Sequence, residues 1–173
     1  MVAGDFVLDR FVYGHPKRIS REAPVLILRF WKEEKLPGGG GNTAANVRAL
    51  GGVPLPVGVV GADAEGRALR EALRARGIDT DGLLEVAAYR TPTKTRILGG
   101  APHAIKQQIV RYDVEEPLGS DTARDAALSG RLAAEARGAD GAILSDYGYG
   151  AISPAAVAAL RGSLSPGARI FVD

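Results

Sequence analysis

The chain has 173 residues, but it has no cysteine, only two histidines and no long apolar run. Without cysteine it can form neither a disulfide nor a thiolate metal site, and this composition is compatible with a reducing compartment. The histidines, His15 and His103, are isolated, so we expect each at the surface or in a loop and neither in a metal site. No segment approaches membrane-spanning length and no signal-peptide pattern opens the chain, which predicts a cytoplasmic protein without a membrane partner.

The chain also lacks a strong charge of either sign. Lysine and arginine total 22 and aspartate and glutamate total 20, which leaves a formal net charge of +2. A field this weak indicates no nucleic-acid partner, despite a sequence pI near 9.0. What the chain does contain is 46% hydrophobic residues. At this length that is enough to bury one core, so we expect a single domain.

Short β-branched or apolar runs alternate with helical segments along much of the sequence. The predicted helices begin after residues that favour an N-cap, namely Asp63, Asp121 and Ser153, and Gly77 is a plausible C′ residue. The strands are predicted within residues 54–61, 141–144 and 168–172, and the helices at residues 64–76, 122–137 and 154–164. Strands separated by helices predict an α/β fold with a parallel sheet wound by right-handed crossovers.

Two regions do not follow this rhythm. Residues 25–31 are apolar on both faces of a strand apart from Arg29, and residues 93–98 and 105–112 read as a strand pair around a turn at 99–102. We interpret them as a small separate sheet inserted into the α/β core. A strand with two apolar faces needs cover on both. One face can close over an active site, and the other can pack on a second subunit.

A carboxylate and a glycine run form the first candidate site. A short opening strand brings Asp9, and the glycines at residues 38–41 lead into a helix on which Asn42 and Asn46 lie one turn apart. Carboxylate and amide groups bind hydroxyls, and bare glycines allow a ligand to approach the main chain. This combination favours a polyhydroxylated ligand. The alternatives are a flexible glycine loop and asparagines that only cap or brace it; the P-loop pattern is absent.

Further candidates lie on later strands. Lys94 and Arg96 are two apart on a predicted strand and therefore project from one face, where they are either solvated or bind a phosphate; Arg111 is a weaker third candidate. Asp146 follows directly on a buried strand, where open α/β sheets place ligand residues. A structural role for Asp146 remains an equal alternative.

The spacing of these features resembles a known family. The glycine run and Asn42 are followed by Ala44, Gly51 and Gly61, which resembles the first signature of the PfkB/ribokinase family of sugar kinases. Residues 4–11, 18–25 and 145–150 resemble, more narrowly, the kinase domain of the bifunctional ADP-heptose synthases, which phosphorylate heptose 7-phosphate. The resemblance runs nearly end to end, but it covers only the N-terminal part of such a kinase.

The resemblance implies a ribokinase-like fold whose lid, roughly residues 11–36 and 91–113, also forms a homodimer. It implies ATP and Mg²⁺ as cofactors and phosphorylation of heptose 7-phosphate at its anomeric hydroxyl, a step toward a lipopolysaccharide precursor. The substrate-binding residues that it implies are Asp9, Gly39, Gly40, Asn42, Asn46, Lys94, Arg96 and Asp146.

The chain also departs from the family pattern. The second signature, a Gly-Ala-Gly-Asp turn that supplies the catalytic base, does not occur. We therefore expect a fragment, truncated at both ends and inactive alone, with the base and the nucleotide-binding half beyond Asp173. Tyr149 stands where the family usually has lysine, which weakens any phosphate contact from that loop. Two alternatives remain open: a kinase for another sugar such as ribose or fructose, and a non-catalytic sugar-binding or dimerising module. A dinucleotide-binding domain is disfavoured because no Gly-x-Gly-x-x-Gly follows an opening strand.

Overall fold

The computed structural model describes residues 1–101 and 103–173, so Pro102 of the predicted turn lies outside the described residues. The described chain alternates strands and helices, as predicted. The strands are β1 Val2–Ile19, β2 Leu26–Gly39, β3 Pro56–Gly61, β4 Leu83–Val86, β5 Thr93–Gly99, β6 Gln107–Val114, β7 Gly141–Ser145 and β8 Arg169–Val172. The helices are α1 Gly40–Ala49, α2 Ala64–Arg74, α3 Thr122–Ala136 and α4 Pro154–Ser163.

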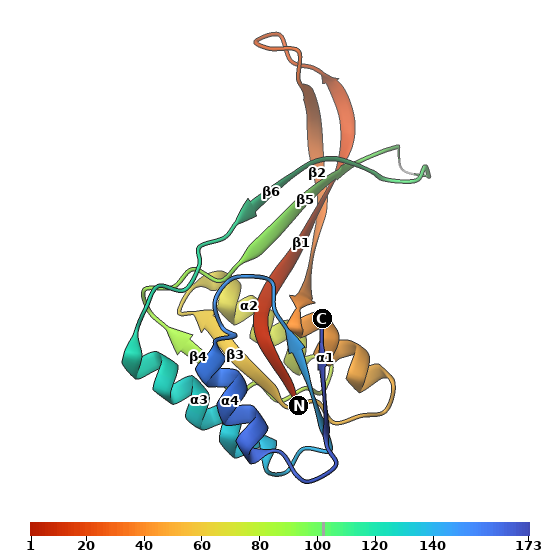
Figure 1. Cartoon of the computed structure of the whole chain (residues 1–173). Helices are drawn as coiled ribbons and strands as arrows, with labels where there is room; N and C mark the ends of the chain where they lie inside the picture. Colours follow the sequence, from red (N-terminus) through yellow and green to blue (C-terminus); the bar gives the residue numbers. More distant parts are fainter. Residues whose placement is uncertain (102) are drawn as a thin grey trace.

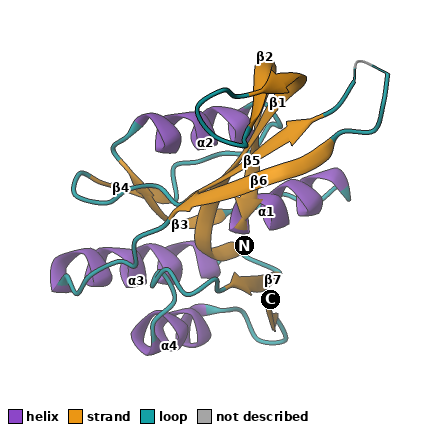
Figure 2. Cartoon of the chain, turned by 90° about the horizontal axis from the view of Figure 1, so that it is seen from above, coloured by secondary structure: helices purple, strands orange, loops and turns teal. Residues whose placement is uncertain are grey.

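The core of the protein is a parallel sheet in the order β4-β3-β1-β7-β8. Helices α1 and α2 cover one face of this sheet and α3 and α4 cover the other (Figures 1 and 2). Because both faces are covered, the core strands are apolar on both sides, and every residue of β3 is buried. The predicted α/β class with a parallel sheet and flanking helices is confirmed, and it matches the ribokinase-like solved structures described below.

Two apolar clusters hold the helices on the sheet. Phe6 of β1 packs with Leu69 and Leu73 of α2 in one cluster, and Leu132 of α3 packs with Leu160 of α4 in the other. All five side chains are at most 1% exposed. Burial of each such side chain contributes about 1.5–3 kcal/mol. The two clusters together bind a pair of helices to each face of the sheet.

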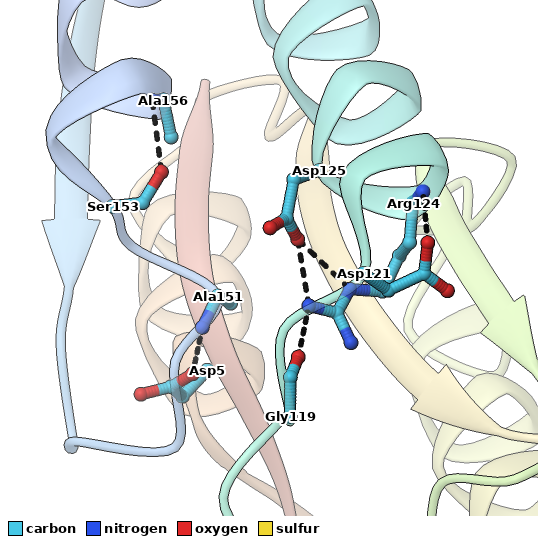
Figure 3. Close-up of polar contacts among 8 residues, drawn as sticks. All are labelled: Asp5, Gly119, Asp121, Arg124, Asp125, Ala151, Ser153 and Ala156. Carbon is cyan, nitrogen blue, oxygen red and sulfur yellow. Dashed lines mark hydrogen bonds and ion pairs between the residues drawn. The ribbon is translucent and has the colours of Figure 1, made fainter.

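The predicted helix starts are confirmed. The side chains of Asp63, Asp121 and Ser153 accept hydrogen bonds from the backbone N–H groups of Gly66, Arg124 and Ala156; Figure 3 shows the last two of these caps. Helix ends were predicted less well, because α2 ends at Arg74 instead of residue 76. Gly77 has the predicted positive φ of 69°, but it lies two residues beyond the C-cap Ala75.

The remaining strands form a lid that shares β1 with the core. In the lid β1 is antiparallel to β2 and parallel to β5, and β5 is antiparallel to β6. Figure 1 shows β1 running without interruption from between the helices into the lid. Two predictions were therefore wrong. The opening strand is not short, since it has 18 residues, and the lid is not a separate sheet.

Other boundaries also differ from the sequence prediction. Strand β2 continues to Gly39, well past residue 31, because its residues pair with β1 along their whole length. Strand β6 begins and ends two residues later than predicted, and β4 was not predicted. Within the described ranges, no helix is both long and apolar enough to cross a lipid bilayer.

Candidate functional site

Two aspartates of β1 mark the point where the strand leaves the core. Asp5 is 3% exposed, and its carboxylate accepts backbone hydrogen bonds from Tyr147 at 2.9 Å, Tyr149 at 3.0 Å and Ala151 at 3.1 Å. Figure 3 shows the bond to Ala151. Burial raises the pKa of Asp5, and the three N–H groups oppose that rise. The side chain therefore holds the loop that follows β7.

Asp9 lies four residues further along β1, where the strand is already part of the lid. Its Oδ1 atom is 2.5 Å from Nη1 of Arg96, and both side chains are about one-fifth exposed. The guanidinium group also lies 5.1 Å from the centre of the Phe11 ring. The structure thus brings together two residues predicted separately, since Arg96 neutralises the carboxylate of Asp9. Sequence spacing gave no signal for this pair, which joins positions 87 apart.

The glycine run lets β2 approach both aspartates closely. A Cβ atom on Gly38 would lie 2.5 Å from Oδ2 of Asp9, and one on Gly39 would lie 2.5 Å from the carbonyl oxygen of Asp5. Gly39 also has a φ of 54°, which disfavours any residue with a side chain. Gly40 begins α1, and a Cβ there would lie 3.2 Å from the Phe6 ring. The glycines therefore allow close packing of β2 on β1, whereas the approach of a ligand to them stays a prediction.

The two asparagines lie on α1, one turn apart and exposed. Neither caps the helix, because the N-cap position is Gly39, which makes no side-chain cap bond. Asn42 lies in the first turn of the helix, next to the glycines, and Asn46 lies one turn further along. Thr43, which sequence reasoning missed, lies between them and has its Oγ1 atom 3.1 Å from Oγ of Ser145 at the end of β7. That contact ties α1 to the loop after β7.

Lys94 lies beside the same loop. Its Nζ atom is 5.6 Å from the centre of the Tyr147 ring and 5.9 Å from that of Tyr149. Tyr149 is buried, donates its hydroxyl hydrogen to the carboxylate of Glu115, and has a raised pKa because of that burial and that bond. The side chain of Tyr149 is therefore engaged within the protein.

Two other candidates have local partners. Asp146 is exposed, and its Oδ1 atom accepts a hydrogen bond from the Gly148 N–H at 3.0 Å, as in a turn. Arg111 on β6 is paired with Asp113, at 2.5 Å between Nη2 and Oδ2. The structure does not bring either residue into contact with Asp9. They lie at the margin of the site, whereas Lys94 and Arg96 lie next to it.

The histidines differ from one another. His103 is exposed, as predicted. His15 is partly exposed on a strand and not in a loop. It lies on β1, stacks on Trp31 with ring centres 5.3 Å apart, and has Nδ1 3.1 Å from the carbonyl oxygen of Gly100. In residues 1–101 and 103–173 no three histidine, aspartate or glutamate side chains gather in a way that could hold a metal ion.

The functional groups thus collect where the core sheet ends and the lid begins. Asp9, Arg96, Lys94 and the glycine run lie together midway along β1, and the loop at the carboxyl end of β7 lies beside Lys94. Ligands of open α/β sheets bind at the carboxyl ends of the core strands. Carboxylate, amide and basic groups in one place can bind the hydroxyls and a phosphate of one small molecule.

Comparison with protein families gives one matching model, which is described as the pfkB family carbohydrate kinase and matches residues 5–118. A curated relative, the bifunctional protein HldE of Gluconacetobacter diazotrophicus, is 42% identical over 171 residues, which is 98% of this chain and 34% of the relative. The HldE protein of Magnetococcus marinus is 42% identical over 158 residues, or 88% of this chain and 31% of that protein. The chain therefore spans about a third of the length of these relatives.

Solved structures show the same fold at low sequence identity. Phosphofructokinase-2 from Escherichia coli, in complex with substrates and products, matches with a TM-score of 0.68 at 19% identity, covering 99% of this chain and 52% of that one. Arabidopsis thaliana ribokinase, complexed with ribose and ATP, matches with a TM-score of 0.61 at 20% identity, again over 99% of this chain and 52% of that one.

Proposed function

Because the chain belongs to the pfkB family of carbohydrate kinases, we propose that it forms the sugar-binding half and lid of an ATP-dependent sugar kinase. The proposed reaction transfers the γ-phosphoryl group of ATP to the anomeric hydroxyl of heptose 7-phosphate, in ADP-heptose biosynthesis. The narrower assignment is supported by the 42% identity to proteins named HldE. It is also supported by the two basic residues next to Asp9, which suit a sugar that already carries a phosphate.

The observation that carries the proposal is the grouping of Asp9, Lys94 and the glycine run midway along β1, where the strand passes from the core into the lid. In this proposal the Asp9 carboxylate accepts hydrogen bonds from sugar hydroxyls, and the main chain at Gly39 and Gly40 allows close approach. Asn42, at the start of α1, supplies a further hydroxyl contact. Asn46 and Asp146 contribute at the margin.

The sugar phosphate is proposed to bind to Lys94 and Arg96. Lys94 is half-buried, rests on two aromatic rings, and within the described residues forms no ion pair with a carboxylate. A phosphate dianion can therefore become its partner without displacing another group. Arg96 differs, because it must either keep Asp9 as its partner or exchange it for the phosphate. Lys94 is accordingly the main phosphate ligand of the proposal.

ATP and Mg²⁺ belong to the proposed reaction, but the described residues contain no metal-ligand cluster. We therefore assign no step to Mg²⁺ within this chain, and we propose that the nucleotide, the metal and the base are held by residues beyond Asp173. What this chain contributes is binding and orientation of the sugar and exclusion of water by the lid. Phosphoryl transfer depends mainly on such positioning.

The second face of the lid is proposed to form a homodimer. It carries an apolar hollow of about 330 Å³, lined by Val12, Tyr13, Gly14, Leu26, Leu28, Phe30, Ile97, Ile109 and Val110. Phe30 is 64% exposed in the single chain, although large apolar side chains on a strand usually find cover. A second lid packed on this hollow would supply that cover without blocking the face that carries Asp9.

The test of the phosphosugar assignment is charge removal in the full-length protein that contains this chain. A charge-assisted hydrogen bond contributes about 1.5–3 kcal/mol, so Lys94→Ala should raise the apparent constant for heptose 7-phosphate roughly ten- to a hundredfold at fixed ATP. The constant for ATP should stay nearly unchanged. The matched control is Lys17→Ala, an exposed lysine on the same strand as Asp9, which should change the sugar constant by less than about twofold.

The outcomes separate the remaining alternatives. If neither Lys94→Ala nor Arg96→Ala alters the sugar constant, the sugar is neutral and the phosphosugar proposal fails. If the full-length protein binds sugars but never transfers phosphate, the non-catalytic module is correct. The 173-residue chain alone should release no ADP above background, because loss of a positioned base costs roughly a hundred- to ten-thousandfold.

A further inference from the structure

We propose that Asp5 is the positioning residue of this site. Its carboxylate fixes the loop of residues 146–151, and this loop, through the rings of Tyr147 and Tyr149, fixes the ammonium group of Lys94. Asp5 touches no substrate in this account, and it acts on the lid from inside the core. The phosphate-binding consequence rests on the function proposed above, whereas the placement of Lys94 does not.

The backbone of the loop is shaped to surround a carboxylate. Its N–H donors to Asp5 come from alternate residues, Tyr147, Tyr149 and Ala151. The residues between the donors are Gly148 and Gly150, with φ of 80° and 95°. Successive N–H groups in a chain that alternates in this way form a concave nest that binds an anion. Here the anion is the side chain of Asp5, and the two glycines supply the conformations that side chains disfavour.

The loop in turn supports Lys94 on two rings. The Nζ atom lies over Tyr147 and Tyr149, at distances typical of a cation–π contact. Tyr149 has two further anchors, because its hydroxyl is bonded to Glu115 and its carbonyl oxygen accepts the Leu118 N–H at 2.8 Å. Loss of the Asp5 contacts would therefore displace the ring of Tyr147 more readily than that of Tyr149, and Lys94 would lose at least one of its two rings. The ammonium group would then lose its fixed position on β5.

The effect of Asp5 can be separated from its place in the core. Its backbone pairs with Val59 of β3, and that pairing does not involve the carboxylate. In the described residues, every hydrogen bond that its carboxylate makes goes to the loop. Asp5→Asn keeps the shape and the strand pairing, but it replaces one acceptor oxygen with an N–H₂ donor that faces other donors. The loop should loosen while the sheet remains.

The first experiment needs no sugar. In the full-length protein, lysine side chains are labelled with ¹³C, and the Lys94 signal is assigned by its loss in Lys94→Arg. We expect the ε-methylene signal of Lys94 to be shifted upfield by the two rings, and Asp5→Asn to move it downfield, toward the position of the exposed Lys17. Lys32 is the internal control, since it lies 4.5 Å from the Tyr13 ring, further along the lid. Its signal should not move.

A second variant keeps the test decisive if Asp5→Asn does not fold. Tyr147→Leu removes one ring, which is 44% exposed, and leaves the Asp5 carboxylate and all three N–H donors in place. The Lys94 signal should move part of the way downfield, and the amides of Tyr147, Tyr149 and Ala151 should remain protected from hydrogen exchange. An unchanged Lys94 signal in either folded variant, or unprotected amides in the wild type, would overturn the proposal.

The sugar experiment then separates this proposal from the proposed function. Asp5→Asn should raise the apparent constant for heptose 7-phosphate at least about tenfold, with little change for ATP, as expected for loss of a charge-assisted contact. If Asp5→Asn moves the Lys94 signal but Lys94→Ala leaves sugar binding unchanged, Asp5 positions Lys94 and the phosphosugar function is wrong. If the signal stays fixed, the positioning role is wrong, whatever the sugar is.

Discussion

The two halves of β1 have the same backbone conformation but different surroundings. Residues 2–8 belong to the core: the first of them pair with β3 and β7, and helices cover both faces of the sheet. Every one of these residues is buried. Residues 9–19 lie between β2 and β5 in the lid, with strands on either side and no helix over them, and they become progressively exposed. One strand can thus serve as core and as binding surface, depending only on what covers it.

The strongest test of this comparison is a pair of aromatic truncations. Phe6→Ala, in the core half, should lower the free energy of unfolding by about 3–5 kcal/mol, because it leaves a cavity among buried side chains. Phe30→Ala, in the lid, should lower it by less than about 0.5 kcal/mol in a monomer, because that ring is mostly exposed. Urea unfolding measures both values. Equal losses would mean that the lid is as well packed as the core.

A charge on the apolar hollow tests whether a partner covers the lid. Leu28→Lys should raise the dimer dissociation constant of the full-length protein at least tenfold, since burying an unpaired ammonium group costs far more than a leucine. Sedimentation velocity at several concentrations measures it. Arg21→Lys, in the exposed turn between β1 and β2, is the control that should leave assembly unchanged. A wild-type monomer at micromolar concentration would contradict the proposed dimer.

The boundary between the halves can be tested at Gly39. A methyl group there would meet the Asp5 carbonyl oxygen at 2.5 Å and would require a φ of 54°. Gly51 has a φ of 90° but no atom within 4 Å of an added Cβ. Gly51→Ala therefore measures the cost of placing a side chain on a backbone with positive φ, without any steric clash. Gly39→Ala should be less stable than Gly51→Ala by about 1–3 kcal/mol, the usual cost of overpacking. Thermal unfolding of both variants provides the comparison.

The smallest effect is expected at Asp63, which links a core helix to the lid. Burial opposes its ionisation, but hydrogen bonds from Thr91 and Gly66 prevail and lower the pKa of Asp63. A lowered pKa in the folded state stabilises the protein above the unfolded value of about 3.9, and this contribution is lost as the pH falls through the folded pKa.

Asp63→Ala should therefore cost about 0.5–2 kcal/mol near pH 7, as for other helix N-caps, and progressively less below about pH 4. Unfolding free energies of wild type and variant across this range measure the difference. Glu71→Gln, on an exposed position of the same helix, serves as the control. A difference that does not change with pH would mean that the charge of Asp63 plays no part.

The features predicted best are those that depend on local sequence patterns. Helix caps were predicted at Asp63, Asp121 and Ser153, and a parallel core sheet was predicted from the alternation of strands and helices. Both predictions were confirmed. The length of β1 was missed, because polar residues such as Asp9 and Arg10 interrupt its apolar pattern where it enters the lid. Only pairing with β2 and β5 keeps it extended there.

The candidate residues were predicted in local groups, but their contacts across the fold were not. Lys94 and Arg96 were expected to share one role, whereas the structure gives them different partners, aromatic rings for one and Asp9 for the other. The nest around Asp5 joins positions more than 140 apart, so no local spacing contains it. The only sign of it in the sequence is the pair of alternating glycines, Gly148 and Gly150. They indicate a loop with unusual backbone conformations, but they do not indicate which anion it binds.

The register of β1 leaves a short segment between its ladders to the core and to the lid. The ladder to β3 ends at Asp5 and the ladder to β5 begins at Leu8, and between them Phe6 and Val7 are paired with Gly39 and Gly38 of β2. A movement of the lid relative to the core would therefore have to bend β1 at these two buried residues, where its partners on β2 are glycines.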